Sequence, residues 1–237
     1  MIRRSSVKVQ TLPTPEATAR AAAEAIAAAA WAALAERGRF VVALSGGRTP
    51  WLMLAELAEL DLPWTRTHIV QVDERVAPAG HADRNLTHIE ECLAAPLSKG
   101  LQVVAMPVEA PDLAAAADEY ARTLRSLAGD PPVLDLVHLG LGPDGHTASL
   151  VPDDEVLTVT ERDVAVTGAY QGCRRMTLTY PALDRARKVL WLVTGAEKSG
   201  MLTRLIRADA GIPAGRVRQV AGVVFADTAA AGGLAFR

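Results

Sequence analysis

Short apolar runs of strand length alternate with helical segments along almost the whole chain. The expected strands are residues 40–44, 68–72, 101–105, 134–139, 164–167, 176–179, 188–194 and 222–226. The expected helices are residues 15–37, 51–60, 85–93, 111–127 and 197–207. This alternation, with no Ser/Pro linker and no internal repeat, predicts α/β architecture around a mostly parallel sheet. We therefore expect residues 1–237 to form a single domain.

Composition narrows the classes of function. Half of the 237 residues are hydrophobic, which is enough for a sizeable core. A formal charge of −2 and a pI near 6.2 give no basic field, so we expect no nucleic-acid partner. Cys92 and Cys173 match no zinc or redox spacing and favour a reducing cytoplasm. The sequence has neither a secretory h-region nor eighteen consecutive apolar residues, and we expect no membrane association.

The stretch 134–150 carries the strongest chemical signal. Its apolar run breaks into a turn that contains Gly140, Gly142 and Gly145, with Asp144 and His146 among them. In an open α/β sheet, ligands bind outside the carboxyl ends of the strands, which is where this turn is expected. Histidine is the side chain whose unperturbed pKa lies nearest neutrality, and here it follows a carboxylate closely. We expect Asp144 and His146 to be functional.

Two other interpretations of this turn stay open. The three glycines also satisfy the dinucleotide fingerprint, but the acidic residues Glu161 and Asp163 precede the next apolar run instead of ending it. This disfavours a nicotinamide or flavin cofactor. His146 could also be a surface histidine without a role, although its place among glycines favours function.

Other expected strands also end in segments of small or charged residues. Residues 40–44 run into Ser45-Gly46-Gly47-Arg48-Thr49-Pro50 and then a helix, an arrangement that binds phosphate through backbone N–H groups and the helix dipole. The loop lacks the Gly-Lys-Ser/Thr of a Walker loop and could be an ordinary glycine turn. Residues 68–72 end in Asp73-Glu74-Arg75, a charged cluster that is either a site or solvated surface. Residues 188–194 end in Gly195-Ala196-Glu197-Lys198.

These strand-end motifs, in this order and spacing, resemble 6-phosphogluconolactonases. Asp73-Glu74-Arg75 with the later His81 and Asn85, and the stretch 174–181, resemble that family too. The resemblance covers about residues 12–228 and implies the fold that the family shares with glucosamine-6-phosphate deaminases, a Rossmann-like three-layer α/β/α arrangement. It implies hydrolysis of 6-phospho-D-glucono-1,5-lactone to 6-phospho-D-gluconate, the second step of the oxidative pentose phosphate pathway.

The chain departs from both relatives at identifiable positions. The deaminases usually place an acid after the histidine turn, whereas this chain has Thr147-Ala148-Ser149-Leu150-Val151-Pro152, which favours the lactonase. Within loop 76–85, Arg84 stands where the lactonases generally have Ser, and Ala77 and Gly80 replace larger or acidic residues. Val151 replaces the usual Phe. These departures bear on substrate contacts and leave the reaction unchanged.

The chemistry requires a positioned water, a base and a holder for phosphate. We expect His146 to be the general base and Asp144 to orient it or its water. Asp73 would accept sugar hydroxyls. We expect no cofactor, no metal and no obligatory protein partner, only the sugar-phosphate lactone. The alternatives are an amino-sugar-phosphate isomerase/deaminase and a non-catalytic sugar-phosphate sensor. The residues expected to bind substrate and phosphate are Ser45, Gly46, Gly47, Arg48, Thr49, Asp73, Arg75, Arg174 and Lys198.

Overall fold

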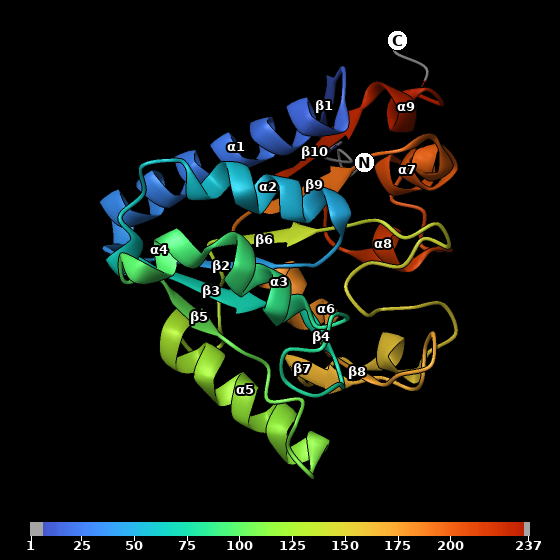
Figure 1. The fold of residues 1–237 in the computed structure, drawn as a ribbon. Helices are drawn as coiled ribbons and strands as arrows, with labels where there is room; N and C mark the ends of the chain where they lie inside the picture. Colours follow the sequence, from blue (N-terminus) through green and yellow to red (C-terminus); the bar gives the residue numbers. More distant parts are fainter. Residues whose placement is uncertain (1–6, 235–237) are drawn as a thin grey trace.

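A seven-stranded sheet runs through the centre of the computed structural model, which describes residues 7–234 (Figure 1). Its strand order is β1-β10-β9-β6-β2-β3-β5, and every neighbouring pair is parallel. The strands are β1 (Lys8–Leu12), β2 (Phe40–Leu44), β3 (Thr67–Gln71), β5 (Gln102–Val104), β6 (Leu136–Leu139), β9 (Val189–Val193) and β10 (Gly222–Asp227).

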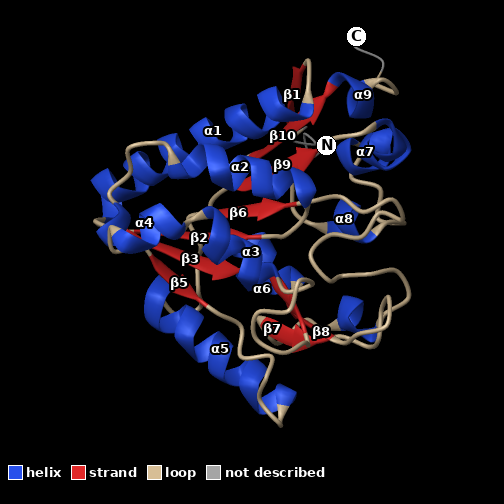
Figure 2. Cartoon of the chain, in the orientation of Figure 1, coloured by secondary structure: helices blue, strands red, loops and turns tan. Residues whose placement is uncertain are grey.

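Helices cover both faces of this sheet and complete three layers (Figure 2). On one face α1 and α2 lie side by side, with α3 and α4 beyond them. The long helix α5 lies on the other side, and α7, α8 and α9 lie near the ends of β9 and β10 (Figure 1). The helices are α1 (Pro15–Arg37), α2 (Arg48–Ala58), α3 (Asn85–Cys92), α4 (Ala94–Ser98), α5 (Leu113–Ala128), α6 (Tyr180–Arg185), α7 (Ser199–Ile206), α8 (Pro213–Arg216) and α9 (Thr228–Ala231), with short 3₁₀ turns η1 (Trp64–Arg66), η2 (Glu155–Thr158) and η3 (Ala196–Lys198).

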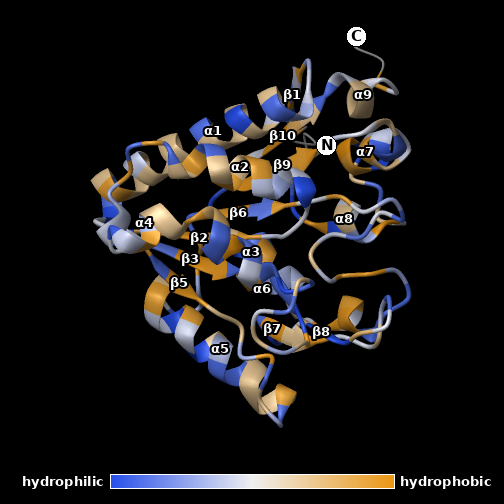
Figure 3. Ribbon diagram, in the orientation of Figure 1, coloured by the Kyte–Doolittle hydropathy of each residue, from blue (hydrophilic) through white to orange (hydrophobic). Residues whose placement is uncertain are grey.

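Strand β2 shows why the central strands are apolar throughout. Successive side chains of a strand point to opposite faces, so Phe40 and Val42 pack in the core beneath α1 and α2, whereas Val41 and Ala43 pack in the core on the other face. All four are buried. A parallel sheet covered on both faces therefore requires a continuous apolar run, which is visible in the orange strands of Figure 3.

A second, antiparallel sheet was not expected from the sequence. It has the order β4-β8-β7 and consists of β4 (Asp73–Arg75), β8 (Arg175–Leu178) and β7 (Val164–Val166). The strands predicted at 164–167 and 176–179 are present, but they pair with each other, and β8 also pairs with the charged segment after β3. The expected mostly parallel sheet is thus confirmed, with an additional small sheet beside it.

The order of the parallel strands locates the ligand crevice. From β2 the chain moves outward to β3 and β5, then returns to β6 on the other side of β2 and continues to β9 and β10. The connections after β2 and β6 therefore diverge, and such a switch point leaves a crevice at the carboxyl ends of the two strands. The glycine loop after β2 and the histidine turn after β6 both lie there.

Smaller differences concern the helix starts and the chain termini. Helix α2 begins at Arg48, earlier than the predicted 51, and the predicted helix 197–207 is divided into the turn η3 and α7. Strand β1 was not predicted.

Within residues 7–234 no helix is both long and apolar enough to cross a membrane.

Candidate active site

A cleft of about 1000 Å³ opens at the carboxyl ends of β2, β6 and β9 and beside β4. Its volume suits a small-molecule ligand. Of the substrate and phosphate residues expected from the sequence, the structure brings eight into its lining: Ser45, Gly46, Gly47, Arg48, Thr49, Asp73, Arg75 and Lys198. His146 also lines the cleft, whereas Asp144 lies behind it.

The loop between β2 and α2 presents backbone N–H groups to the cleft. Gly47 has a φ of 130°, a value that favours glycine. A Cβ atom on Gly46 would lie 1.9 Å from Oδ1 of Asn85, so only glycine fits there. No side chain caps the N-terminus of α2, which leaves the first N–H groups free for an anion. The loop therefore leaves uncapped N–H groups at the start of a helix, a geometry that suits an anion.

A contact between two threonines brings the end of β9 to this loop. The hydroxyls of Thr49, in the first turn of α2, and Thr194, after β9, lie 2.6 Å apart. Lys198 follows in η3 and is half-buried, and burial lowers the pKa of its ammonium group while Glu197 and Asp144 oppose that shift. A cation is thus held on the same side of the cleft as the free helix N-terminus.

The turn after β6 holds His146 by backbone geometry. The N–H of Gly142 donates to the carbonyl of His146 over 2.8 Å, so the turn closes on itself. A Cβ atom on Gly142 would lie 2.1 Å from Nδ1 of His146, and glycine is therefore required for the ring to fold back over the turn. Gly145 has a φ of 85°, and a Cβ atom there would overlap Ile212. Gly142 and Gly145 thus each have a steric reason to be glycine.

Asp144 binds His146 twice through one oxygen. Its Oδ1 accepts the backbone N–H of His146 at 3.1 Å and lies 2.6 Å from ring Nδ1. Burial opposes ionisation of Asp144, but these contacts and the hydroxyl of Tyr170 outweigh it and lower the carboxyl pKa. Because an ionised carboxylate only accepts hydrogen bonds, Nδ1 of the neutral ring carries the proton, and in that tautomer Nε2 has the lone pair.

Asp73 is the buried acid of the cleft. It is 7% exposed and accepts a hydrogen bond of 2.6 Å from the hydroxyl of Ser149. Burial raises the pKa of Asp73, and the Ser149 hydrogen bond and the nearby Arg175 oppose the rise. Ser149 belongs to the segment in which deaminases usually carry an acid, and here it serves to hold Asp73.

The charged segment of β4 is divided between site and scaffold. Asp73 and Arg75 line the cleft, whereas Glu74 is fully buried and pairs with Arg84 at 3.1 Å. Arg84 is only 2% exposed and donates to the carbonyl of Ala77, so it stabilises the loop and does not line the cleft. Arg84, which stands where the lactonases generally have Ser, therefore affects how loop 76–85 is held in place.

Arg174 is not brought to the cleft. It is exposed and its nearest hydrogen-bond acceptor is the carbonyl of Thr167, at 3.5 Å. The next residue, Arg175, is 4% exposed and lines the cleft. Because side chains alternate along a strand, only one of two successive arginines can face the site. The sequence analysis expected Arg174 to bind substrate, whereas the structure places Arg175 in the cleft lining instead.

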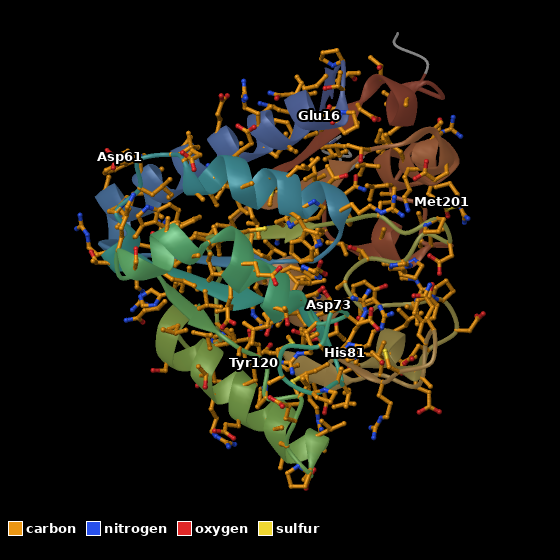
Figure 4. The ribbon with its side chains drawn as sticks, viewed as in Figure 1. Glu16, Asp61, Asp73, His81, Tyr120 and Met201 are labelled. Atoms are coloured by element: carbon orange, nitrogen blue, oxygen red, sulfur yellow. The ribbon has the colours of Figure 1, made fainter. Side chains whose placement is uncertain are left out.

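The sequence analysis also missed residues that come from other elements. Asn85 donates to the carbonyl of Asp73 at 2.9 Å. Tyr170 reaches Asp144 from the loop between β7 and β8. The only local signal for Tyr170 was Gln171-Gly172, a pair suited to a tight hairpin turn. His81 lies on the exposed loop after β4 and does not line the cleft, whereas Asp73 does; both are labelled in Figure 4.

No metal centre is formed by the described part of the chain. Within residues 7–234 no group of at least three His, Cys, Asp or Glu side chains lies close enough together to bind a metal ion.

This chain is similar to known proteins over most of its length. Residues 13–226 match the family described as glucosamine-6-phosphate isomerases/6-phosphogluconolactonase. The 6-phosphogluconolactonase of Synechocystis sp. is 38% identical over 184 residues, covering 75% of this chain and 76% of the relative. The human 6-phosphogluconolactonase is 36% identical over 212 residues, covering 82% and 81%.

Solved structures share the fold. The 6-phosphogluconolactonase from Thermotoga maritima is 30% identical, with a TM-score of 0.80 over 93% of this chain and 99% of that one. The enzyme from Trypanosoma brucei is 27% identical, with a TM-score of 0.84 over 97% and 99%. A monomeric glucosamine-6-phosphate deaminase, 18% identical, has the same fold with a TM-score of 0.80 over 96% and 100%. The chain belongs to the glucosamine-6-phosphate isomerase/6-phosphogluconolactonase family.

Proposed function

We propose that the protein is a 6-phosphogluconolactonase, which hydrolyses 6-phospho-D-glucono-1,5-lactone to 6-phospho-D-gluconate in the oxidative pentose phosphate pathway. The observation that carries the proposal is the Asp144–His146 pair, at 2.6 Å, whose histidine lines a cleft that also contains an uncapped helix N-terminus. The proposed base and the proposed anion site thus face one cavity. The curated relatives named 6-phosphogluconolactonase support the same substrate.

The proposed reaction follows from the proton positions of this pair. Nε2 of His146 takes a proton from water as the water oxygen attacks the lactone carbonyl carbon, and Asp144 stabilises the imidazolium that forms. The tetrahedral intermediate then collapses, the bond from C1 to the ring oxygen breaks, and the imidazolium returns its proton to that oxygen. No covalent intermediate with the protein is needed.

The substrate would be oriented by its phosphate. The loop 45–49 and Lys198 face the cleft from neighbouring segments, which the Thr49–Thr194 contact holds together. A phosphate dianion there would receive N–H hydrogen bonds and a charge-assisted contact. Asp73 and Arg75, on the β4 side of the cleft, are proposed to contact the sugar hydroxyls and carboxyl end. The lactone is the only partner that this arrangement requires.

The cytoplasm is our proposed compartment, because Cys92 and Cys173 are both free thiols.

The deaminase alternative is disfavoured because residues 147–152 place no carboxylate in the cleft. Of these residues, only Thr147 and Ala148 contribute to the lining. An ammonia assay with glucosamine 6-phosphate tests it directly.

The decisive experiment is the His146→Ala variant, assayed on freshly prepared lactone with the spontaneous rate subtracted. We expect kcat to fall by about 10²–10⁴-fold, the range of a general base, while 6-phosphogluconate still binds. His81→Ala, on the exposed loop, is the matched control and should keep full turnover. Near-normal turnover in His146→Ala would remove this residue from the reaction, and ammonia release would replace the proposed function.

A further inference from the structure

The Asp144 carboxylate is held at both of its oxygens. Oδ1 accepts from His146, and Oδ2 accepts the hydroxyl of Tyr170 at 3.0 Å. A carboxylate anchored at one oxygen can still rotate about its terminal bond, because that torsion is broad. The second anchor removes this freedom, so the orientation of Oδ1 toward the histidine ring depends on Tyr170.

Tyr170 is itself held by its own hairpin. Gln171 and Gly172 have φ values of 52° and 86°, and Tyr170 and Cys173 exchange backbone hydrogen bonds of 3.0 and 3.4 Å. Two successive residues with positive φ are the signature of a tight type I′ hairpin turn. The Tyr170 backbone is therefore placed by a two-residue turn between β7 and β8.

The ring of Tyr170 has a partner on each side. The guanidinium carbon of Arg175 lies 5.0 Å from the ring centroid, and the imidazole of His146 meets the ring edge-on, with centroids 5.7 Å apart. Arg175 is buried in β8 and donates to the Gln171 side chain at 3.3 Å. The ring is fixed between a buried cation and the proposed base.

The protonation of Tyr170 suits a hydrogen-bond donor. Burial and the neighbouring Asp144 carboxylate raise the pKa of the Tyr170 hydroxyl. Its proton is therefore retained at neutral pH and points to an acceptor that is ionised. The direction of the hydrogen bond, from the neutral tyrosine to the carboxylate, is set by these two protonation states.

We propose that Tyr170 is a positioning residue of the active site, which orients the Asp144 carboxylate and thereby holds His146 as the tautomer with the proton on Nδ1. The inference rests on the proposed lactonase reaction. It gives the small antiparallel sheet a function, since β8 and its hairpin supply the outer support of a base that is carried by β6 of the main sheet.

The test is Tyr170→Phe, which removes the hydroxyl and keeps the ring between Arg175 and His146. We expect kcat for the phosphorylated lactone to fall about 10- to 100-fold, consistent with the loss of one hydrogen bond to a charged group, and KM to stay within about twofold. The control is Tyr180→Phe, because Tyr180 is also half-buried and donates to a carbonyl, that of Pro213, at 3.0 Å, but does not line the cleft. It should leave kcat unchanged.

Two further readouts separate positioning from general damage. In ¹⁵N-histidine NMR, His146 of the wild type should show the Nδ1–H tautomer, and Tyr170→Phe should show a mixture. In an Asp144→Asn background, Tyr170→Phe should have less than about twofold effect on kcat, because the two residues act through one contact.

The possible failures are distinguishable. Unchanged kcat and an unchanged tautomer in Tyr170→Phe, with His146→Ala still inactive, would overturn this inference and leave the lactonase reaction intact. A raised KM with normal kcat would equally overturn it and place Tyr170 in substrate binding. Full turnover in His146→Ala would instead refute the proposed reaction itself.

Discussion

The buried carboxylate of Glu74 accepts four hydrogen bonds. Oε1 accepts the backbone N–H groups of Arg75 and Asn85, and Oε2 accepts the Gln71 side chain and the N–H of Leu86, each at 2.8 Å. The guanidinium of Arg84, with a side chain only 3% exposed, lies 3.1 Å from Oε2. Glu74 thus connects β3 and β4 to the start of α3.

Glu74→Gln is the perturbation that isolates this role, because it keeps the shape and removes the charge. The amide NH₂ must face two of the four donors, so two hydrogen bonds to a charged acceptor are lost. The buried Arg84 also loses its near carboxylate and keeps only the longer pairing with Glu109, at 3.7 Å. Each such hydrogen bond contributes about 1.5–3 kcal/mol, and breaking a buried ion pair typically costs about 3–5 kcal/mol. We expect the free energy of unfolding to fall by about 3–5 kcal/mol.

Urea unfolding at pH 7, followed by tryptophan fluorescence, measures this change, and the denaturant dependence should stay unaltered. Glu56→Gln is the matched control: its ion pair with Arg20 is exposed, with side chains 35% and 66% accessible, and is worth less than about 1 kcal/mol. The double variant Glu74→Gln/Arg84→Met should recover part of the loss. Equal stabilities of Glu74→Gln and Glu56→Gln would refute the reasoning.

Two other predictions concern Lys198 in the cleft and the buried His138 of β6. Lys198→Ala should raise KM for the phosphorylated lactone about 10- to 100-fold, the equivalent of one charge-assisted contact, whereas Arg174→Ala, at an exposed position, should leave KM unchanged. Competition by 6-phosphogluconate measures the affinity of both variants. Equal affinity of wild type and Lys198→Ala would contradict the assignment. His138 is fully buried, and burial lowers its pKa to about 3, so only the unfolded state gains a proton as pH falls below 6.5. From pH 7 to 5 the wild type should therefore lose about 2 kcal/mol more stability than His138→Asn, as urea unfolding at both values would reveal; parallel losses would count against it.

Local sequence patterns predict much of this fold. The apolar runs that became β2, β6 and β9 were predicted because a strand buried on both faces has to be apolar throughout. The glycines after β2 and two of the three after β6 marked the turns, since their conformation or their close approach to neighbours excludes a side chain. Such signals depend on a few adjacent residues, and these were sufficient to place the motifs that meet in the cleft.

The assignment of neighbouring charges required the tertiary structure. Within Asp73-Glu74-Arg75 and within Arg174-Arg175, which side chain faces the cleft depends on strand pairing between β4 and β8, and a shift of one residue would reverse every side chain. The small antiparallel sheet itself joins segments about 100 residues apart, for which no local pattern exists. The contact of Tyr170 with Asp144 depends in turn on that sheet, because only the packing of the β7–β8 hairpin against the β6 turn brings a tyrosine to the carboxylate.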